Sequence, residues 1–569
     1  MKQQCQYCIL LIICAANFLN AQTLFENQAT NLGLNTSTGD TFLGNGLSFF
    51  DFDNDGWDDI TLTSSENNPL RFFKNNNGSF IEQDFGLSSI DYQTKSVTWV
   101  DFDNDGDNDL FVTSDAQGNK MFENLGNMVF QDISVNTGMI ITNMFTYGAS
   151  WGDINNDGFL DVFLSNRTSD ITNKLYKNNG DGTFTDITSQ SGIDQNPVFS
   201  FCSAFVDINN DGYQDLYVSN DKLSYENKLY RNNGDGTFTD ISASSGTNIS
   251  VDAMSVTVGD YNRDGYFDIY VTNNPTGNYL FRNNGDETFQ DVAMATGTSF
   301  NSIGWGASFF EADNDMDVDL YVSGQLDGSS SGLLSAAFYE NNNNTNYVLN
   351  NNCFPNDNGA SYSNATGDID NDGLLDIVVS NNANENVFLW RNVSSNSNNW
   401  IKLKLIGVQS NANAIGARIE ISTDGYKQYA YTICGEGYLA QMTDRTHFGL
   451  GNHSVIDYIK IYWPNGLEET YTDVQVNQTL ILTEGDTLSV NTYEENNITF
   501  NNPVAQNLYI ETTKFIQDIS LYTIQGQLLS KVTTQNKFQT IDMANFKSGI
   551  YLLNITFENQ SSTFKVVKK

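Results

Sequence analysis

The sequence predicts an all-β fold: a seven-bladed β-propeller over residues 22–398, a small β-domain over 399–485 and an Ig-like β-sandwich over 496–569. Three observations predict it. An acidic segment recurs seven times at intervals of 50 to 57 residues, each interval holds four short strand patterns, and the composition changes after residue 398. Four-stranded units repeated at this period are typical of propeller blades.

The first 21 residues predict a cleaved export signal. Lys2 provides a positive start, Ile9 to Phe18 form an apolar stretch, and the small residue Ala21 precedes the expected cut. Three of the six cysteines lie in this segment. The other three allow at most one disulfide, and their pairing is left open: Cys202, Cys353 and Cys434. No later stretch approaches the roughly 20 apolar residues of a membrane-spanning helix, so no transmembrane segment is expected.

Each acidic segment has the spacing of a calcium loop. Oxygen-bearing side chains occupy positions one, three and five, a glycine at six permits a sharp turn, the carbonyl at seven adds a ligand, and a carboxylate at nine completes the shell. Oxygen ligands without His or Cys fit Ca²⁺ and not zinc. The predicted ligands of loops one to seven are Asp51, Asp53, Asp55, Trp57 and Asp59; Asp101, Asp103, Asp105, Asp107 and Asp109; Asp153, Asn155, Asp157, Phe159 and Asp161; Asp207, Asn209, Asp211, Tyr213 and Asp215; Asp260, Asn262, Asp264, Tyr266 and Asp268; Glu311, Asp313, Asp315, Asp317 and Asp319; and Asp368, Asp370, Asp372, Leu374 and Asp376.

Two other interpretations of these segments fit the sequence less well. Asp-Asn-Gly clusters also form ordinary turns, because their side chains bond to their own backbone, but six full copies at near-constant spacing favour calcium. An EF-hand requires a Glu at position twelve and flanking helices, whereas position twelve is apolar in all seven loops and each loop leads into a strand. In loop six Met316 replaces the turn glycine, so the sequence predicts six well-formed calcium loops and one altered loop.

Along the strands of each repeat, β-branched and aromatic residues alternate with other residues, as they do in half-buried sheets. In the third repeat they are Asp161 to Ser165, Lys174 to Lys177 and Phe184 to Thr188, and a further strand enters each loop. The seventh repeat lacks its last strand, and residues 24–33 parallel residues 183–192. We therefore predict that the N-terminal strand completes the seventh unit and removes exposed sheet edges, with an open solenoid as the alternative.

Residues 23–398 resemble FG-GAP/VCBS-type repeats, the calcium-loop propellers also used by integrin α subunits. The segments Tyr147 to Gly152 and Gly304 to Ser308 match the style of these repeats. After Gly324 the sixth repeat is stretched by Leu326 to Ser335, a Gly/Ser-rich insertion that is a candidate contact surface or else a functionless loop.

Residues 399–485 resemble the ASPIC/UnbV module, which commonly follows such propellers. The resemblance lies in Gly416 to Ile421, Gly435 to Gln441, His447 to Gly451 and Ile456 to Gly466. Family copies tend to carry Ser where Ala440 stands. Glu436 and His447 can pair as an acid and a base, although a structural histidine is the favoured interpretation.

Residues 486–495 are predicted to be a linker, and residues 496–569 resemble the type A C-terminal sorting domain of the Bacteroidetes type IX secretion system. The basic end Lys565 to Lys569 favours sorting over an ordinary Ig-like adhesion domain. This resemblance implies that the type IX secretion machinery is a partner and that the protein is secreted or attached to the outer cell surface.

The formal net charge of −42 argues against a nucleic-acid partner. Two Gly-x-Ser-x-Gly matches, centred on Ser150 and Ser330, lack the strand–turn–helix context of a hydrolase, and no convergent catalytic motif was found. The sequence therefore predicts a secreted or cell-surface calcium-binding propeller that acts in adhesion or ligand binding and is not an enzyme, with an unidentified polysaccharide or protein ligand. The alternative is a carbohydrate-active enzyme, a lyase or hydrolase, on a propeller scaffold.

Overall fold

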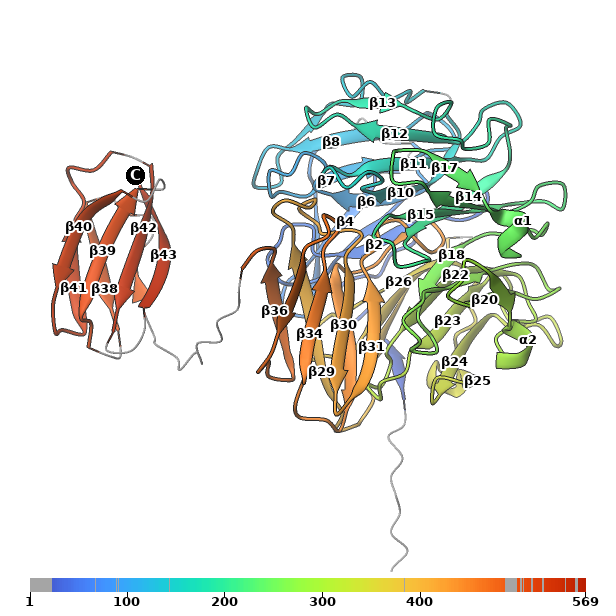
Figure 1. Cartoon of the computed structure of the whole chain (residues 1–569). Helices are drawn as coiled ribbons and strands as arrows, with labels where there is room; N and C mark the ends of the chain where they lie inside the picture. The colour runs from blue at the N-terminus through green and yellow to red at the C-terminus, as the bar shows by residue number, and fades with distance from the viewer. Residues whose placement is uncertain are drawn as a thin grey trace, which may run out of the picture. The chain divides into compact units, whose positions relative to one another are not determined.

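The computed structural model describes residues 23–486 and 499–569, apart from positions 67, 88–89, 91, 143, 383, 502–503, 505, 513–514, 524–526, 548 and 558–560. The chain divides into two compact units, Met1–Asp486 and Thr487–Lys569 (Figure 1). The predicted export signal and all but the first residue of the predicted linker lie outside the described residues.

Four-stranded antiparallel sheets recur along the first unit, as the strand patterns predict. In six of the sheets the strands follow one another in chain order: β2 (Leu47–Phe50), β3 (Asp59–Leu62), β4 (Arg71–Asn75), β5 (Phe80–Gln83); β6 (Val97–Val100), β7 (Asp109–Val112), β8 (Lys120–Asn124), β9 (Phe130–Asp132); β10 (Thr146–Gly152), β11 (Asp161–Asn166), β12 (Lys174–Asn178), β13 (Phe184–Asp186); β14 (Ser200–Val206), β15 (Asp215–Asn220), β16 (Lys228–Asn232), β17 (Phe238–Asp240); β18 (Val256–Gly259), β19 (Asp268–Val271), β20 (Tyr279–Asn283), β21 (Phe289–Asp291); and β22 (Gly304–Phe310), β23 (Asp319–Gly324), β24 (Ala336–Asn342), β25 (Asn346–Leu349). Single-turn helices α1 (Ser242–Ser245), α2 (Ala293–Thr296) and η2 (Asn351–Cys353) lie in connections.

The last repeat is completed by the N-terminal strand. Strands β26 (Ser361–Gly367), β27 (Asp376–Asn381) and β28 (Phe388–Asn392) form a sheet whose fourth strand is β1 (Phe25–Asn27). The register pairs Phe25 with Asn392, and the Phe25 ring stacks on that of Phe354 with centroids 4.2 Å apart. The predicted return of the N-terminus to the seventh repeat is confirmed.

In six of the seven repeats a buried asparagine at the end of the third strand joins neighbouring sheets. The side-chain amide of Asn178 donates to the carbonyl of Phe102 at 2.8 Å, and that of Asn392 donates to Ala312 at 2.6 Å. Asn75 of the first complete sheet donates to Ile369 of the last repeat at 2.8 Å. The all-β architecture, with repeated four-stranded sheets tied to one another in this way, fits a propeller.

Residues 399–485, called the module below, form two further sheets around one apolar core. The first contains β29 (Asn399–Ile406), β33 (Arg445–Gly451) and β36 (Gln478–Thr483). The second contains β30 (Arg418–Thr423), β31 (Tyr426–Tyr431), β34 (Tyr458–Tyr462) and β35 (Glu468–Tyr471). A short strand, β32 (Ala440–Gln441), leaves the module and pairs in parallel with β2, so that module and repeats belong to one compact unit.

The second unit also has two sheets and a single apolar core. One sheet contains β37 (Thr499–Phe500), β38 (Asn507–Glu511) and β41 (Phe538–Asp542). The other contains β39 (Asp518–Thr523), β40 (Leu528–Thr533), β42 (Gly549–Thr556) and β43 (Ser561–Lys568). Ile519, Leu521 and Leu553 lie fully buried between them.

Candidate metal centre

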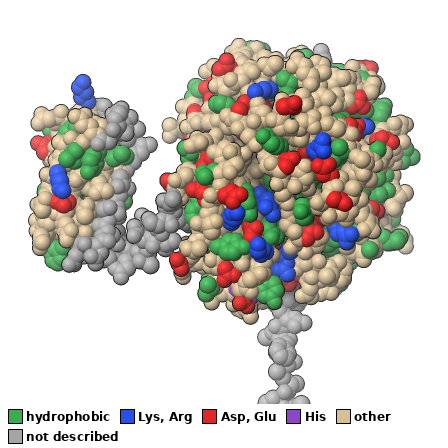
Figure 2. All heavy atoms as spheres, viewed as in Figure 1, with side chains coloured by type: hydrophobic (Ala, Val, Ile, Leu, Met, Phe, Trp, Pro, Cys, Tyr) green, Lys and Arg blue, Asp and Glu red, His purple; other side chains and the backbone are tan. Residues whose placement is uncertain are grey.

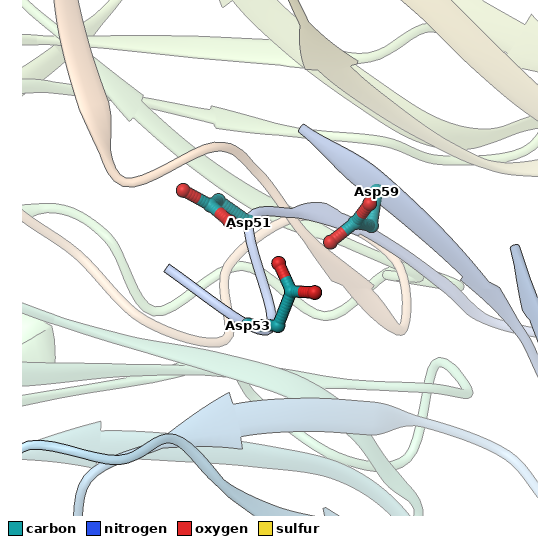
Figure 3. A group of neighbouring side chains, drawn as sticks. All are labelled: Asp51, Asp53 and Asp59. Carbon is teal, nitrogen blue, oxygen red and sulfur yellow. The ribbon is translucent and has the colours of Figure 1, made fainter. Parts of the chain in front are cut away.

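Each acidic loop connects the first strand of a sheet to the second, as loop one does between β2 and β3. Because every sheet repeats the same connection, the loops lie on one face of the repeats, called the loop face. Figure 3 shows Asp51, Asp53 and Asp59 of loop one, which belong to a group of carboxylates with ligand atoms within 4.8 Å of one another. Loops two, six and seven bring three carboxylates equally close: Asp101, Asp103 and Asp109; Glu311, Asp313 and Asp315; and Asp368, Asp370 and Asp376. Loops three to five carry asparagine at position three.

The carboxylate at position nine is buried in every loop and held by two backbone donors. In loop one, Asp59 accepts the N–H of Phe52 at 3.2 Å and that of Asn75 at 2.7 Å. The equivalent pair of bonds recurs in loops two to seven. Burial raises the pKa of Asp59 and of Asp109 to about 9, and the other carboxylates of the loop add to the shift. Without a cation, this position favours the protonated acid.

Positions one and five shape the turn. Asp51 accepts the backbone N–H groups of Asp55 and Gly56 at 3.0 and 2.8 Å, and Asp55 accepts the N–H of Trp57 at 3.0 Å. The bonds to position one recur in loops two to five and seven, and the bond to position five recurs in all seven. Burial raises the pKa of the position-one acid in loops two to four to about 6. These hydrogen bonds fix the curl of the loop and the positions of its oxygen ligands.

The donor set fits a hard cation. Carboxylate and amide oxygens converge from positions one, three, five and nine, and several buried oxygens of the loops have no hydrogen-bond donor: Asp53 Oδ1, Asn155 Oδ1 and both oxygens of Glu311. Buried acceptors without donors are costly unless an ion or water satisfies them. In loop six, Met316 adopts the left-handed conformation that glycine has elsewhere (φ 80°), so the altered loop keeps its turn and its grouped carboxylates.

Position four was not singled out from the sequence, yet it links the loops. Asn104 of loop two donates its amide to the carbonyl of Gly158 in loop three at 2.8 Å, and Asn371 of loop seven donates to Gly56 of loop one at 3.1 Å. Equivalent bonds join the other neighbouring loops except five to six, where position four is Arg263. The signal was present in the sequence, because Asn stands at this position in six of the seven loops.

The module covers the loop face with a stripe of basic and aromatic side chains. Ile401 and Leu403 of β29 enter the module core, and the residues that alternate with them are Trp400, Lys402 and Lys404. Lys402 Nζ lies 2.7 Å from Asp368 Oδ2 and 2.9 Å from Asn371 Oδ1. On β33, which pairs with β29, Arg445 forms ion pairs with Asp51 and Asp58. These charges are nearly fully buried, so loops one and seven carry counter-ions from the module.

A segment of the module also fills the centre of the repeats. Tyr438 is fully buried against Tyr147, Phe201, Trp305 and Tyr362, which come from different sheets, and its hydroxyl donates to the carbonyl of Leu43 at 2.6 Å. This packing places a module side chain among four of the sheets of the repeats. Cys202 and Cys434 are buried free thiols near this region, and Cys353 is free elsewhere.

Glu436 and His447, the hypothesised acid–base pair, have separate partners. His447 Nε2 lies 2.6 Å from Asn314 Oδ1, and Glu436 accepts the N–H of Val258 at 2.9 Å. Burial lowers the pKa of His447 to about 3 and raises that of Glu436 to about 7. Both line one cavity of about 210 Å³ between module and repeats, and no hydrogen bond joins them within the described part of the chain.

Ser150 of the first Gly-x-Ser-x-Gly match is buried inside β10, as the sequence predicts.

The buried carboxylates give the calcium-free protein a defined pH dependence. A carboxyl group ionises near pH 4 in an unfolded chain, whereas the pKa of folded Asp59 and Asp109 is about 9. The folded state therefore binds more protons, and we expect its stability to fall as the pH rises from about 5 to 9. Thermal melts of metal-stripped protein across this range test the sign. A melting temperature that rises with pH in the absence of calcium would contradict it.

Models of known protein families match the repeats, the module and the second unit. Models of the FG-GAP-like repeat match residues 51–112, 101–164, 153–218, 207–271 and 264–322. The ASPIC and UnbV model matches residues 407–489, and a secretion system C-terminal sorting domain matches residues 499–569. The chain thus carries all three kinds of segment expected from its sequence. The sorting domain indicates type IX secretion to the cell surface or extracellular space, and no helix in the described ranges is long and apolar enough to cross a membrane.

The chain is also similar to cartilage acidic protein 1. It is 27 % identical to the Xenopus tropicalis protein over 265 residues, which cover 45 % of this chain and 40 % of that protein. It is 28 % identical to the human protein over 261 residues, covering 44 % and 39 %. The matched region spans about two fifths of the length of these relatives.

Proposed function

We propose that the protein is a secreted or cell-surface calcium-binding propeller that acts as an adhesion or ligand-binding protein. In this proposal the repeats of residues 22–398 close into a seven-bladed ring, the module of 399–485 caps it, and 496–569 is an Ig-like sorting domain. The observation that carries the proposal is the recurring loop network, in which buried carboxylates are positioned by the same backbone donors in each repeat. The bonds from Asn75 and Asn371 support ring closure, because each joins the first repeat to the last.

Calcium has a structural role in this proposal. The loops hold most of their acidic groups in a small buried volume, and like charges at this density repel one another unless cations neutralise them.

The outer surface of the module over β30, β31 and β34 shows both basic and acidic side chains (Figure 2). Lys427 pairs there with Glu420 at 2.7 Å and Lys460 with Glu468 at 2.6 Å. A surface of mixed sign does not favour nucleic acid.

The ligand is expected on the face opposite the loops, called the far face, because the module occupies the loop face. A groove of about 960 Å³ opens on the far face between the sixth and seventh repeats. Its lining includes Asp327 and Ser335 from the Gly/Ser-rich insertion, Asn384 and Glu385 from the β27–β28 connection, and the ring of Phe388. The amide, hydroxyl and carboxylate groups of this groove, together with the ring of Phe388, are suited to bind a neutral polymer that is rich in hydroxyl groups. The described residues lining the groove include no Lys or Arg that would attract an anionic one.

We expect the full calcium-loaded chain to retain a neutral soluble polysaccharide, and the Asp327→Ala and Asn384→Ala variants to bind it about fivefold more weakly, since each removes a hydrogen-bonding group worth about 1 kcal/mol. Affinity electrophoresis on dextran, mannan and laminarin, with alginate as the anionic comparison, measures retention, and size-exclusion chromatography follows polymer length. Asn196→Ala, in a separate groove of the far face, is the matched control.

Three outcomes change the proposal. Equal retention of all variants would exclude this groove, shortened polymer would favour the carbohydrate-active enzyme, and no retention of any polymer would favour a protein ligand.

A further inference from the structure

The loops fall into two classes that differ in the residue preceding the buried asparagine of the third strand. In loops one, three, four, five and seven this residue is basic: Lys74, Lys177, Arg231, Arg282 and Arg391. Lys74 Nζ lies 2.9 Å from Asp55 Oδ2 and also pairs with Asp53, Lys177 Nζ lies 3.2 Å from Asp157 Oδ2, and Arg391 pairs with Asp370. The third strand thus supplies a counter-ion that reaches into three of these loops.

Loops two and six have a glutamate in this place, Glu123 and Glu340. They are also the loops with an aspartate at position seven, Asp107 and Asp317, where the other five have an aromatic residue or leucine. Each of the two therefore gathers six carboxylates: Asp101, Asp103, Asp105, Asp107, Asp109 and Glu123; and Glu311, Asp313, Asp315, Asp317, Asp319 and Glu340. Within the described ranges, none of these twelve groups forms an ion pair with a Lys or Arg.

The difference in local charge is large. Loops three and four each combine three loop carboxylates, at positions one, five and nine, with one basic side chain, a net charge that one Ca²⁺ neutralises. Loop five, which also carries Arg263 at position four, is less negative still. Loops two and six carry six carboxylates each, three times the net negative charge of loops three and four, and have a glutamate in place of the basic residue before the buried asparagine. Calcium affinity rises with the number of charged ligands and the rigidity of the site, and a tethered Lys or Arg repels an incoming cation.

Loop six also contains a buried acidic side chain whose oxygens have no hydrogen-bond donor. Glu311 is only 4 % exposed, and neither of its carboxylate oxygens has a hydrogen-bond donor. It lies among acidic partners, because the charges of Asp313, Asp315, Asp317 and Asp319 all act on it. The module backbone closes over it: a Cβ built on Gly449 would lie 2.3 Å from Glu311 Oε2. Asp315, at position five, accepts the N–H of Asp317 at 3.2 Å, which keeps the turn folded without a glycine.

We propose that loop six with Glu340, together with loop two with Glu123, forms a class of tight cation sites, distinct from five weaker loops. The inference rests on the proposed calcium binding. The tight class is expected near a Kd of about 10⁻⁶ M and the weak class near about 10⁻⁴–10⁻³ M, the ranges of carboxylate-rich and of weak extracellular calcium sites. Loop six, whose turn departs most from the repeat pattern, is then one of the two loops that fill first.

The test is equilibrium dialysis of the full, metal-stripped chain against ⁴⁵Ca²⁺. We expect one equivalent for each of loops two and six to bind at micromolar free calcium and the remainder only near millimolar. Glu340→Gln and Glu123→Gln, which keep shape and remove one charge, should each weaken one tight equivalent by about tenfold or more. Glu82→Gln is the matched control, because Glu82 lies exposed on β5 and its one ion pair among the described residues is with Arg71.

A gain-of-affinity variant tests the same idea in the opposite direction. Lys74→Glu removes the cation from loop one and should bring a further equivalent toward the tight class. Melting of each variant in saturating calcium checks that it folds. A single class of equal sites, or an unchanged tight class in both glutamine variants, would overturn the inference and leave calcium binding intact. No calcium bound below 10 mM would overturn the proposed function as well.

Discussion

Chelation of calcium is expected to lower the melting temperature of the first unit by about 10 °C or more. A loop with a Kd of about 10⁻⁴–10⁻³ M adds about 1–2 kcal/mol to the free energy of unfolding at about 2 mM calcium, because the ion binds only the folded state. Seven loops together contribute on the order of 10 kcal/mol, comparable to the whole stability of many domains.

The burial of the position-nine carboxylates is the physical reason for this expectation. Asp59 and its equivalents at position nine are at most 3 % exposed, so without a cation they must be protonated or carry an uncompensated buried charge. The loops are also tied to one another through bonds such as Asn104 to Gly158 and Asn371 to Gly56. We therefore expect the loss of ions to destabilise all the repeats together in one transition.

Differential scanning calorimetry of the full chain in 2 mM calcium and in EGTA measures the shift. The second unit carries none of the acidic loops, so its own transition is an internal control that should not move. Magnesium at the same concentration should restore little stability, because it requires tighter octahedral geometry and retains its water. Identical melting of the first unit in calcium and EGTA would show that the loops are ordinary turns.

The features that repeat along the chain could be predicted from the sequence. Each strand pattern recurs at a fixed offset from an acidic loop, so the strand that begins at Asp161 also identifies those that begin at Asp215 and Asp268. The absent last strand of the seventh repeat was visible against this pattern, and Phe25 does pair with Asn392. Repetition turned weak local signals into a prediction of architecture.

The contacts between module and repeats could not be predicted in the same way. Lys402 and Arg445 stand in alternating strands whose basic residues would suit a solvated face equally well, and nothing local indicates that they face Asp368 and Asp51. Tyr438 likewise belongs to a short loop of the module that packs among the sheets of the repeats. Such long-range packing is encoded in shape and charge complementarity between distant segments, which a single sequence does not display.

Replacing Arg445 by methionine should destabilise the calcium-free protein by about 3–5 kcal/mol, the usual cost of leaving buried carboxylates without their partner. Arg445 pairs with Asp51 and Asp58, each of which is only 2 % exposed. In calcium the loss should be smaller, because an ion held by Asp51 neutralises part of the same charge. Urea unfolding with and without calcium measures both values. Arg71→Met, which breaks an exposed pair with Glu82, is the control and should cost at most about 1 kcal/mol.

Adding Asp58→Asn to the Arg445→Met protein should restore part of the lost stability, because the amide removes one of the two unpaired charges and can still accept the N–H of Asp368, which donates to Asp58 at 3.0 Å. This rescue separates charge from packing: methionine preserves most of the apolar stem of arginine, and only an electrostatic loss is repaired by a neutral partner. An equal loss in calcium and in EGTA, with no rescue, would mean that Arg445 acts through shape alone. A loss of stability that is smaller in calcium than in EGTA would instead show that the module and loop one are coupled by charge. The ion and the guanidinium of Arg445 would then both neutralise Asp51.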